Sequence, residues 1–232
     1  MALIKFGGGI TEMRGSIAGN VFARNRYGAY VRSRTKPVNP NSTSQALVRS
    51  AMSAVTEYWS HTVSSAERIA WATYAAAVAM KNKLGETIYL SGFNHFVRGN
   101  ASRARLGLNI IAPGPTTLAL PEKDTTIAIT ASVATQKISI AFDNTQAWAT
   151  EADSHLLLFA GQPQQETRNF FAGPWKYAGK VTGVATPAPT SPAAIDSPYT
   201  LVLGQRVFGY VMIIRADGRV SEPMYVSCTV AA

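Results

Sequence analysis

The spacing of apolar residues changes near residue 112, and this change constrains the fold more than any other sequence feature. Before it, apolar residues recur every three or four positions, as on one face of a helix. After Ala112-Pro-Gly-Pro-Thr-Thr117 they alternate with polar or small residues, as in half-buried strands. Proline and glycine stop regular structure, so this segment marks a domain boundary. We therefore predict an α+β chain with an extended basic arm at 1–41, a helical domain at 42–112 and an all-β domain at 113–232.

The helical part carries two N-terminal capping boxes, Ser42 with Gln45 and Ser64 with Glu67. In a capping box the hydroxyl and the residue three positions later satisfy each other's free backbone N–H groups. We predict one helix from Ser42 to about His61 and a second from Ser64 to about Lys83. An antiparallel helical hairpin follows from the short connection. Trp59 and Trp71 are expected in the core between these helices. Leu84-Gly85 is expected to stop the second helix, and residues 87–90 to be extended. A third helix is expected to be capped by Ser91, with Phe93, Phe96 and Val97 on its inner face.

The all-β part has about seven short segments of alternating pattern, which is typical of a β-sandwich of the immunoglobulin or fibronectin type III kind. Ala216-Asp-Gly-Arg219 is expected to form a hairpin turn. The proline-rich stretch 186–198 is either a long loop or a strand that switches between sheets. Cys228 is the single cysteine, so an intrachain disulfide is excluded and we expect a small buried hydrophobe there.

Positive charge is concentrated in the first half of the chain. Residues 1–110 hold 14 Lys and Arg against 4 Asp and Glu, whereas residues 111–232 hold 8 against 9. Within residues 14–36 there is no acid. That stretch is predicted to form a hairpin around Arg24-Asn-Arg-Tyr-Gly28, because Asn25 and Gly28 accept the positive φ of tight turns. An isolated hairpin is marginal in water, so it needs a partner surface.

The side chains of this arm allow three interpretations. Arginine and tyrosine are favoured anchors at protein interfaces. Arginines also neutralise phosphates while aromatic rings stack on bases, as in nucleic-acid binding. A solvated, disordered tail is the third interpretation, although the alternation of Tyr30-Val-Arg-Ser-Arg34 favours a strand. The candidate interface residues are Arg24, Arg26, Tyr27, Tyr30, Arg32 and Arg34.

Catalytic and metal-binding patterns do not emerge from the sequence. His61, His95 and His155 stand far apart without a second ligand at metal-binding spacing, and we expect His95 to be a surface or boundary residue. Asp143, Glu151 and Asp153 are interpreted as solvated loop acids. A nucleophile elbow is absent from the sequence, and Gly173–Lys180 departs from phosphate-loop spacing. The prediction is a non-enzyme without cofactor or metal. The start of the chain lacks a signal-peptide pattern and no run of 18 apolar residues occurs, so membrane insertion is not expected.

Several strings resemble a family of largely uncharacterised bacteriophage and prophage proteins. They are Gly15-Ser-Ile-Ala-Gly-Asn20, Arg24 to Pro40, Ser64 to Trp71, Phe170-Phe-Ala-Gly-Pro-Trp175 and Arg215-Ala-Asp-Gly-Arg219. The resemblance covers most of the chain and carries no catalytic role. It implies a virion structural protein, made in the bacterial host cytoplasm, that decorates or cements the capsid or attaches in the neck or tail.

The expected partners are therefore capsid, neck or tail subunits and further copies of the chain. An extended arm suits assembly because such segments become ordered when they dock on neighbours. Two alternatives stay open. The arm contacts nucleic acid, or the sandwich loops bind a host surface as an adhesin.

Overall fold

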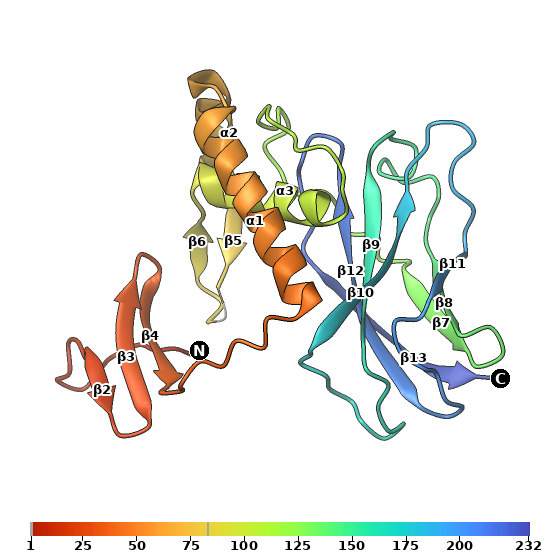
Figure 1. Ribbon diagram of the computed structural model, residues 1–232. Helices are drawn as coiled ribbons and strands as arrows, with labels where there is room; N and C mark the ends of the chain where they lie inside the picture. Colours follow the sequence, from red (N-terminus) through yellow and green to blue (C-terminus); the bar gives the residue numbers. More distant parts are fainter. Residues whose placement is uncertain (1, 83) are drawn as a thin grey trace.

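The computed structural model describes residues 2–82 and 84–232, which form three helices and three β-sheets. Its α+β class agrees with the prediction. In Figure 1 a small N-terminal sheet lies apart from the large C-terminal one, with the helices between and above them. The strands and helices, in chain order, are β1 Ala2–Leu3, β2 Gly15–Ile17, β3 Asn20–Asn25, β4 Gly28–Ser33, α1 Thr43–His61, α2 Ser65–Ala77, β5 Ala79–Lys81, β6 Thr87–Tyr89, α3 Gly92–Arg105, β7 Ala128–Ser132, β8 Lys137–Ala141, β9 His155–Gly161, β10 Trp175–Thr182, β11 Ala193–Asp196, β12 Arg206–Ile214 and β13 Met224–Ala231.

The N-terminal sheet, hereafter the arm sheet, has the strand order β1-β4-β3-β2. The predicted hairpin is confirmed: β3 and β4 pair antiparallel from Asn20↔Ser33 to Asn25↔Gly28, with two residues in the turn. Gly28 has φ of 124°, a value that favours glycine. Asn25 acts differently from the prediction, because it shapes the turn by accepting a hydrogen bond from the Tyr27 backbone N–H at 2.9 Å.

Both capping boxes are present, so α1 and α2 begin where the sequence predicts. The three helices enclose a core of Val55, Val63, Trp71, Tyr74, Val78 and Phe96. Trp71 is fully buried and its indole Nε1 donates to the Ala112 carbonyl at 2.9 Å. Trp59 packs against this cluster and contacts Phe96 with ring centroids 4.9 Å apart.

The prediction that the second helix runs to about Lys83 is wrong. Lys83 itself lies outside the described residues, but α2 ends at Ala77 and the chain then enters β5, which pairs antiparallel with β6. The Asn82 side chain directs this change, because its Oδ1 accepts from the backbone N–H groups of Leu84 and Glu86. Gly85, expected as a helix stop, instead takes φ of 78° inside this hairpin connection.

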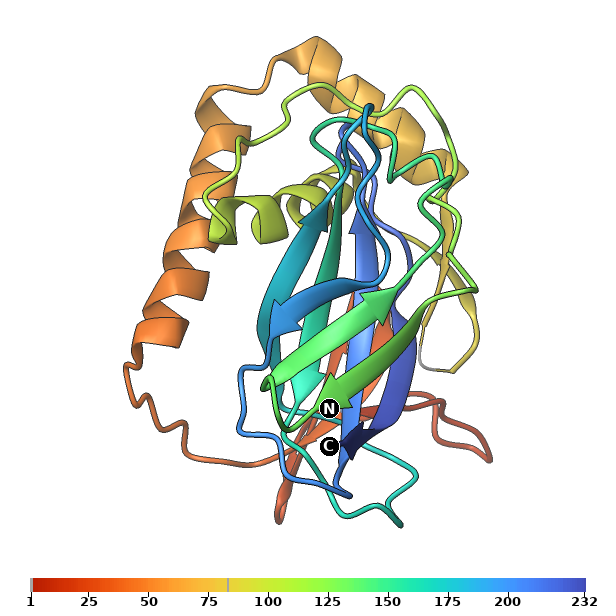
Figure 2. The same cartoon turned by 90° about the vertical axis from the view of Figure 1, so that its right-hand side faces the viewer.

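The C-terminal part is one seven-stranded sheet in the order β10-β9-β12-β13-β7-β8-β11. It folds over on itself, so that β7, β8 and β11 cross in front of β9, β10 and β12 in Figure 2. β13 joins the two halves by pairing antiparallel with β12 and parallel with β7. The stretch 186–198 contains β11, which pairs with β8 although the preceding β10 pairs with β9. The strand-switch interpretation of this stretch therefore holds.

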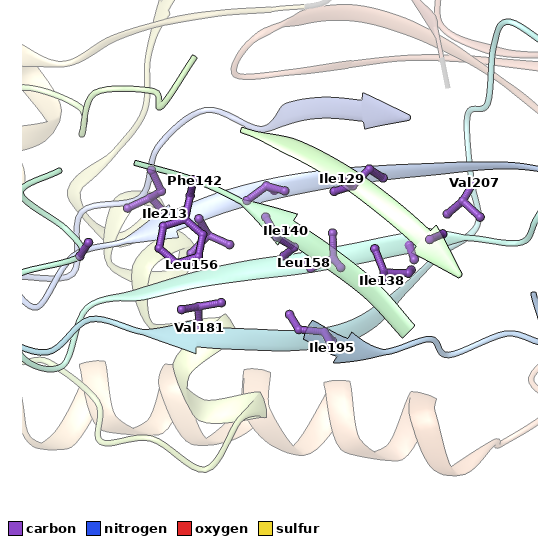
Figure 3. Packing of buried hydrophobic residues seen from close by; sticks show 14 of the residues in the cluster. Ile129, Ile138, Ile140, Phe142, Leu156, Leu158, Val181, Ile195, Val207 and Ile213 are labelled. Atoms are coloured by element: carbon purple, nitrogen blue, oxygen red, sulfur yellow. The ribbon is translucent and has the colours of Figure 1, made fainter. Parts of the chain in front are cut away.

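A cluster of 17 buried side chains fills the space between the two halves of the folded sheet. Figure 3 shows isoleucines from β7 and β8 facing leucines from β9 across this space. Ile140, Leu156 and Leu158 have no solvent exposure. Burying each such side chain contributes about 1.5–3 kcal/mol, so this core stabilises the C-terminal part.

Candidate assembly surfaces

The arm sheet contains no buried residue. Every residue from 2 to 41 is exposed or half-exposed, and none belongs to a buried cluster. The sheet therefore has backbone hydrogen bonds but no core. Three or more strands need an apolar face or a covering element for independent stability. A surface outside this sheet is needed to cover one of its faces.

The structure places the candidate interface residues on more than one side of the arm sheet. Tyr30 and Arg32 are two positions apart on β4 and so project from one face. Arg24 pairs with Ala29, the neighbour of Tyr30, so it projects from the opposite face. The other three lie at the ends of the strands, Arg26 and Tyr27 in the turn and Arg34 after β4.

Only part of the arm's positive charge is neutralised within the chain. Arg14 and Arg24 both pair with Glu12, at 2.9 and 3.6 Å, and the hydrogen bond from Arg14 holds the pKa of this carboxyl below its usual value. Among residues 2–82 and 84–232, Arg26, Arg32 and Arg34 form no ion pair. These three guanidinium groups can bind an acceptor from another molecule.

Three side-chain contacts attach the arm to the helical part, and one of them runs from Arg49 Nη2 of α1 to Asn39 Oδ1 at 2.8 Å. The Tyr27 hydroxyl accepts a hydrogen bond from Asn94 Nδ2 of α3 at 2.8 Å. Lys5 forms an exposed ion pair with Glu86, next to β6. Tyr27, expected to contact a partner, thus already contacts its own chain. Exposed pairs of this kind contribute about 0–1 kcal/mol, so the attachment is weak.

The helical part is joined to the C-terminal sheet through α3. Arg98 donates to the carbonyls of Val220 and Ser221, at 2.8 Å each. Gly99 lies so close to the Gly218 carbonyl that a Cβ would come within 2.2 Å of its oxygen. The predicted hairpin turn 216–219 is confirmed, with Gly218 at φ of 85° and its backbone N–H bonded to the Arg215 carbonyl. These contacts fix the turn against the helix.

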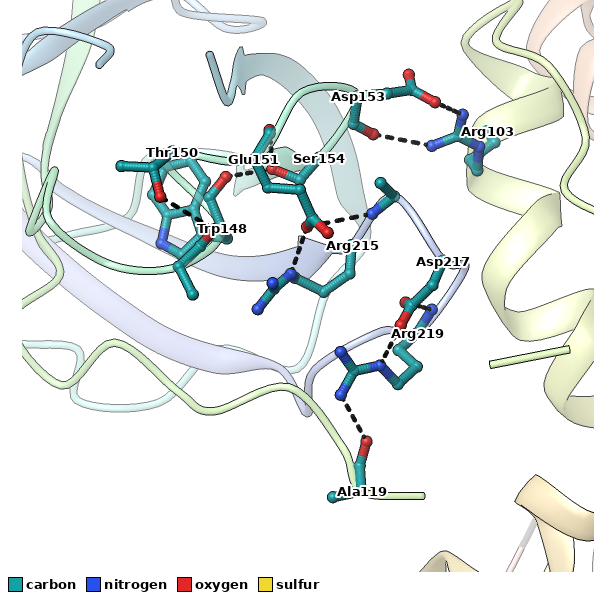
Figure 4. A network of polar contacts seen from close by, with 12 residues as sticks. Arg103, Ala119, Trp148, Thr150, Glu151, Asp153, Ser154, Arg215, Asp217 and Arg219 are labelled. Carbon is teal, nitrogen blue, oxygen red and sulfur yellow. Dashed lines mark hydrogen bonds and ion pairs between the residues drawn. The ribbon is translucent and has the colours of Figure 1, made fainter. Parts of the chain in front are cut away.

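Arg103 extends this junction and is the largest buried charged side chain there, at 1% exposure. It donates to the Asn109 carbonyl at 2.9 Å, the Asp153 carbonyl at 3.2 Å and the Asp153 carboxylate at 2.5 Å (Figure 4). Arg103 is not singled out from the sequence, because arginine is usually exposed, although its place seven residues after Phe96 puts it on the buried face of α3. Its ion-pair partner lies 50 residues away.

The interpretation of the loop acids as simply solvated is wrong. Glu151 pairs with Arg215 and Asp153 with Arg103, each at 2.5 Å. Asp143 accepts from the Thr145 backbone N–H and hydroxyl, which hold the pKa of its carboxyl below the usual value. The three acids therefore serve as structural acceptors in the loop between β8 and β9.

The surface or boundary position expected for His95 is also wrong. Its side chain is 3% exposed and lies edge-on to Tyr74, with ring centroids 5.0 Å apart. Burial and the nearby Arg98 lower the pKa of His95 to about 4. His155 is buried at the start of β9, and burial lowers the pKa of its imidazole too. Within the described chain no three His, Cys, Asp or Glu residues cluster in a way that would hold a metal ion.

Cys228 is half-buried, less enclosed than expected, and burial raises the pKa of its thiol to about 11. The thiolate is the nucleophilic form, so this cysteine is unreactive at neutral pH. No helix in residues 2–82 and 84–232 has the length and apolar character to cross a membrane.

An aromatic surface covers the outer side of the C-terminal sheet. Trp175 meets Tyr210 edge-on at 5.2 Å, and Tyr210 stacks at 4.7 Å on Phe159, which is 7% exposed and belongs to a buried cluster beneath this surface. The surface continues into an open pocket of about 490 Å³ lined by Phe170, Phe171, Trp175, Phe208 and Tyr225. Phe170 and Tyr225 are 72% and 70% exposed. Aromatic rings that are both large and exposed are typical of interaction surfaces.

Neither a known protein family nor a curated protein matches this chain.

Proposed function

We propose that this chain is a non-enzymatic structural protein of a bacteriophage particle. In this proposal the arm and the helical part together anchor the chain to neighbouring subunits of the particle, and the C-terminal sheet is presented outward. Capsid, neck or tail subunits and further copies of the chain are the partners. The strings that resemble phage and prophage proteins support the virion assignment, including the arm itself.

The proposal depends chiefly on one observation, the absence of any buried residue from 2 to 41 in a segment that forms four strands. Ordering each backbone residue costs about 1–2 kcal/mol. Without a core, the arm sheet lacks the burial that offsets this cost elsewhere in the chain. The arm has the residue pattern of strands and carries arginines without ion-pair partners in the described chain. Such a segment can bury its side chains against a neighbouring molecule, as an assembly arm does.

We further propose that the C-terminal part is an immunoglobulin-like or fibronectin III-like sandwich. Its first, second and fifth strands (β7, β8, β11) lie in one half, and its third, sixth and seventh (β9, β12, β13) in the other. The same division separates strands A, B and E from C, F and G in immunoglobulin domains. The fourth strand, β10, lies beside the third. Such a domain suits outward presentation because its core is independent of the arm.

Particle incorporation tests the virion proposal. Particles are purified from the producing cells, and the chain is quantified by mass spectrometry for the wild type and for a Tyr30→Ser, Arg32→Ser, Arg34→Ser variant. Loss of the variant from particles is expected, because these residues supply contacts of the arm. A control variant carries Lys137→Ser, Arg168→Ser and Lys176→Ser in the C-terminal part; it loses three positive charges, one more than the arm variant, and is expected to be retained. Absence of the wild-type chain from particles would contradict the proposal.

Nucleic-acid binding is a second candidate function, favoured by the three arginines without an ion-pair partner in the described chain. Removing an arginine that neutralises a phosphate makes the affinity less dependent on salt. Fluorescence anisotropy with duplex DNA at several salt concentrations separates the two functions. Tight binding that falls steeply with salt and is abolished in the Tyr30, Arg32, Arg34 variant would favour the nucleic-acid role over the assembly role.

A further inference from the structure

A pocket lined by both apolar and charged side chains lies where the interdomain segment passes over the C-terminal sheet. Its volume is about 330 Å³, and its walls come from residues 117–122, residues 146–148 and the end of β12 with the following turn. This pocket is distinct from the arm and from the aromatic surface. Two of its residues, Arg215 and Arg219, belong to the string Arg215-Ala-Asp-Gly-Arg219, for which the assembly role gives no purpose.

Each of the two arginines bonds an acidic side chain through its Nε. Arg215 Nε bonds Glu151 at 2.5 Å, and Arg219 Nε bonds Asp217 at 2.6 Å. Arg219 Nη1 also donates to the Ala119 carbonyl at 3.1 Å. Within residues 2–82 and 84–232 the remaining terminal nitrogens, both of Arg215 and Nη2 of Arg219, have no hydrogen-bond partner. Figure 4 shows the two guanidinium groups on the side of the turn away from α3.

Trp148 also lines this pocket and carries a buried donor of its own. Its side chain lines the pocket and is 2% exposed. Its indole Nε1 is buried without a hydrogen-bond partner in the described chain. A buried N–H group without an acceptor costs about 1–3 kcal/mol. Because this nitrogen is closed off from the open pocket, a ligand there would reach it only after nearby side chains moved, whereas the indole ring itself lines the pocket and senses a bound ligand.

We propose that this pocket binds a carboxylate group. All unpaired groups named above are donors, so the ligand must supply acceptors. Two terminal guanidinium nitrogens match the two oxygens of a carboxylate, which arginine binds in a fork geometry. Glu151 and Asp217 already balance the charges of Arg215 and Arg219, and exposed Glu122 adds a negative charge at the rim. The five groups together carry one negative charge, so a carboxylate would be held by the free donors and not by net positive charge, and a dianion such as phosphate would be repelled more strongly than a monoanion.

The indole N–H signal of Trp148 provides a local measurement. The full-length protein, labelled with ¹⁵N, is titrated with sodium acetate at constant ionic strength, with sodium chloride as the compensating salt. The four tryptophans give four indole signals, and Trp148→Phe identifies the relevant one. We expect a saturable shift of this signal. The Trp71 indole, which donates to the Ala112 carbonyl, is expected to stay in place.

Three variants are expected to differ in their affinity for acetate. Arg215→Gln removes two free donors and one charge, so affinity for acetate is expected to fall by about tenfold or more. Glu122→Gln removes the rim charge without touching the core, so affinity is expected to rise severalfold. Arg32→Gln makes the same charge change as Arg215→Gln but in the arm, and it is expected to leave the affinity unchanged.

Several results would overturn the carboxylate assignment. These are an unsaturated shift, an identical response to chloride, tighter binding of inorganic phosphate than of acetate, or weaker acetate binding in Glu122→Gln. If Arg215→Gln fails to give a dispersed spectrum, the sign of the Glu122→Gln effect decides. The inference is independent of the virion role, because it concerns the C-terminal part of an isolated chain.

Discussion

The arm sheet and the C-terminal sheet have the same kind of secondary structure but opposite relations to a core. The arm sheet has four strands and no buried residue. The C-terminal sheet has seven strands folded around 17 buried side chains. Strand pattern and turn chemistry therefore produce hydrogen-bonded ladders in both, while only the second also gains the burial that makes a sheet independently stable.

The two regions also differ in how completely their charged side chains are paired within the chain. In the C-terminal part and its junction with α3, acids pair with arginines, as Glu151 does with Arg215 and Asp153 with Arg103. In the arm, a single acid, Glu12, contacts two arginines, and the remaining ones are left for other acceptors. The C-terminal part thus pairs its own charges, whereas the arm leaves arginines available to acceptors outside the described residues, as the proposed assembly role requires.

The largest expected effect comes from truncating the C-terminal core. Leu158→Ala removes a fully buried side chain and is expected to lower the free energy of unfolding by about 2–5 kcal/mol. Urea denaturation monitored by circular dichroism measures it. Leu203→Ala, at a 63% exposed position, is the matched control and is expected to change stability by less than about 0.5 kcal/mol. Equal effects at the two sites would mean that the described core is wrong.

Acid is expected to destabilise the folded helical part through His95. Its pKa is about 4 in the folded chain and about 6.5 when unfolded, so the unfolded state binds the proton first as pH falls. The contribution of neutral His95 to the free energy of unfolding is fully present above about pH 6.5. It declines as the pH falls toward 4, by up to about 3 kcal/mol. Denaturation of the wild type and of His95→Phe across this range isolates the effect. A pH dependence unchanged by the substitution would contradict a neutral buried imidazole.

Breaking the junction ion pair is expected to have an intermediate effect. Asp153→Ala leaves buried Arg103 without its carboxylate partner and is expected to cost about 1–3 kcal/mol in unfolding experiments. Asp196→Ala provides the control, since its pair with Lys137 is exposed and contributes about 0–1 kcal/mol. The junction would be unimportant if both variants unfolded at the same denaturant concentration.

The smallest expected effect is in the arm. Phe22→Ala, on half-exposed β3, is expected to change the free energy of global unfolding by less than about 0.5 kcal/mol, because the arm sheet adds no core. The same denaturation assay applies. A loss comparable to that of Leu158→Ala would show that the arm is part of the stable unit and would remove the contrast between the two sheets.

Local signals predicted much of this fold. The capping boxes at Ser42 and Ser64 located the starts of α1 and α2, and alternation located the main C-terminal strands. Gly85 was ambiguous, because the same residue suits a helix end and a hairpin. The alanine run stays helical to Ala77, and β5 follows it in a local hairpin with β6, whose connection the Asn82 side chain shapes by accepting from Leu84 and Glu86.

The site residues were harder to predict than the strands. The arm arginines stood out by composition, but only the β3–β4 register separates Arg24 from Tyr30 and Arg32. His95 and Arg103 look exposed in sequence because polar residues usually are. Their burial depends on Tyr74 and on Asp153, which lie 21 and 50 residues away and leave no local pattern.

Hydrogen exchange of the isolated full-length chain tests the central contrast most directly. We predict that arm-sheet amides, such as those of Phe22 and Val31, exchange with opening free energies within about 2 kcal/mol of zero, whereas those of Leu158 and Val211 exchange only on global unfolding. Binding of an assembly partner is expected to slow exchange in the arm alone. Protection of the arm equal to that of β9 and β12 in the isolated chain would contradict the contrast between a coreless arm and a self-sufficient C-terminal sheet.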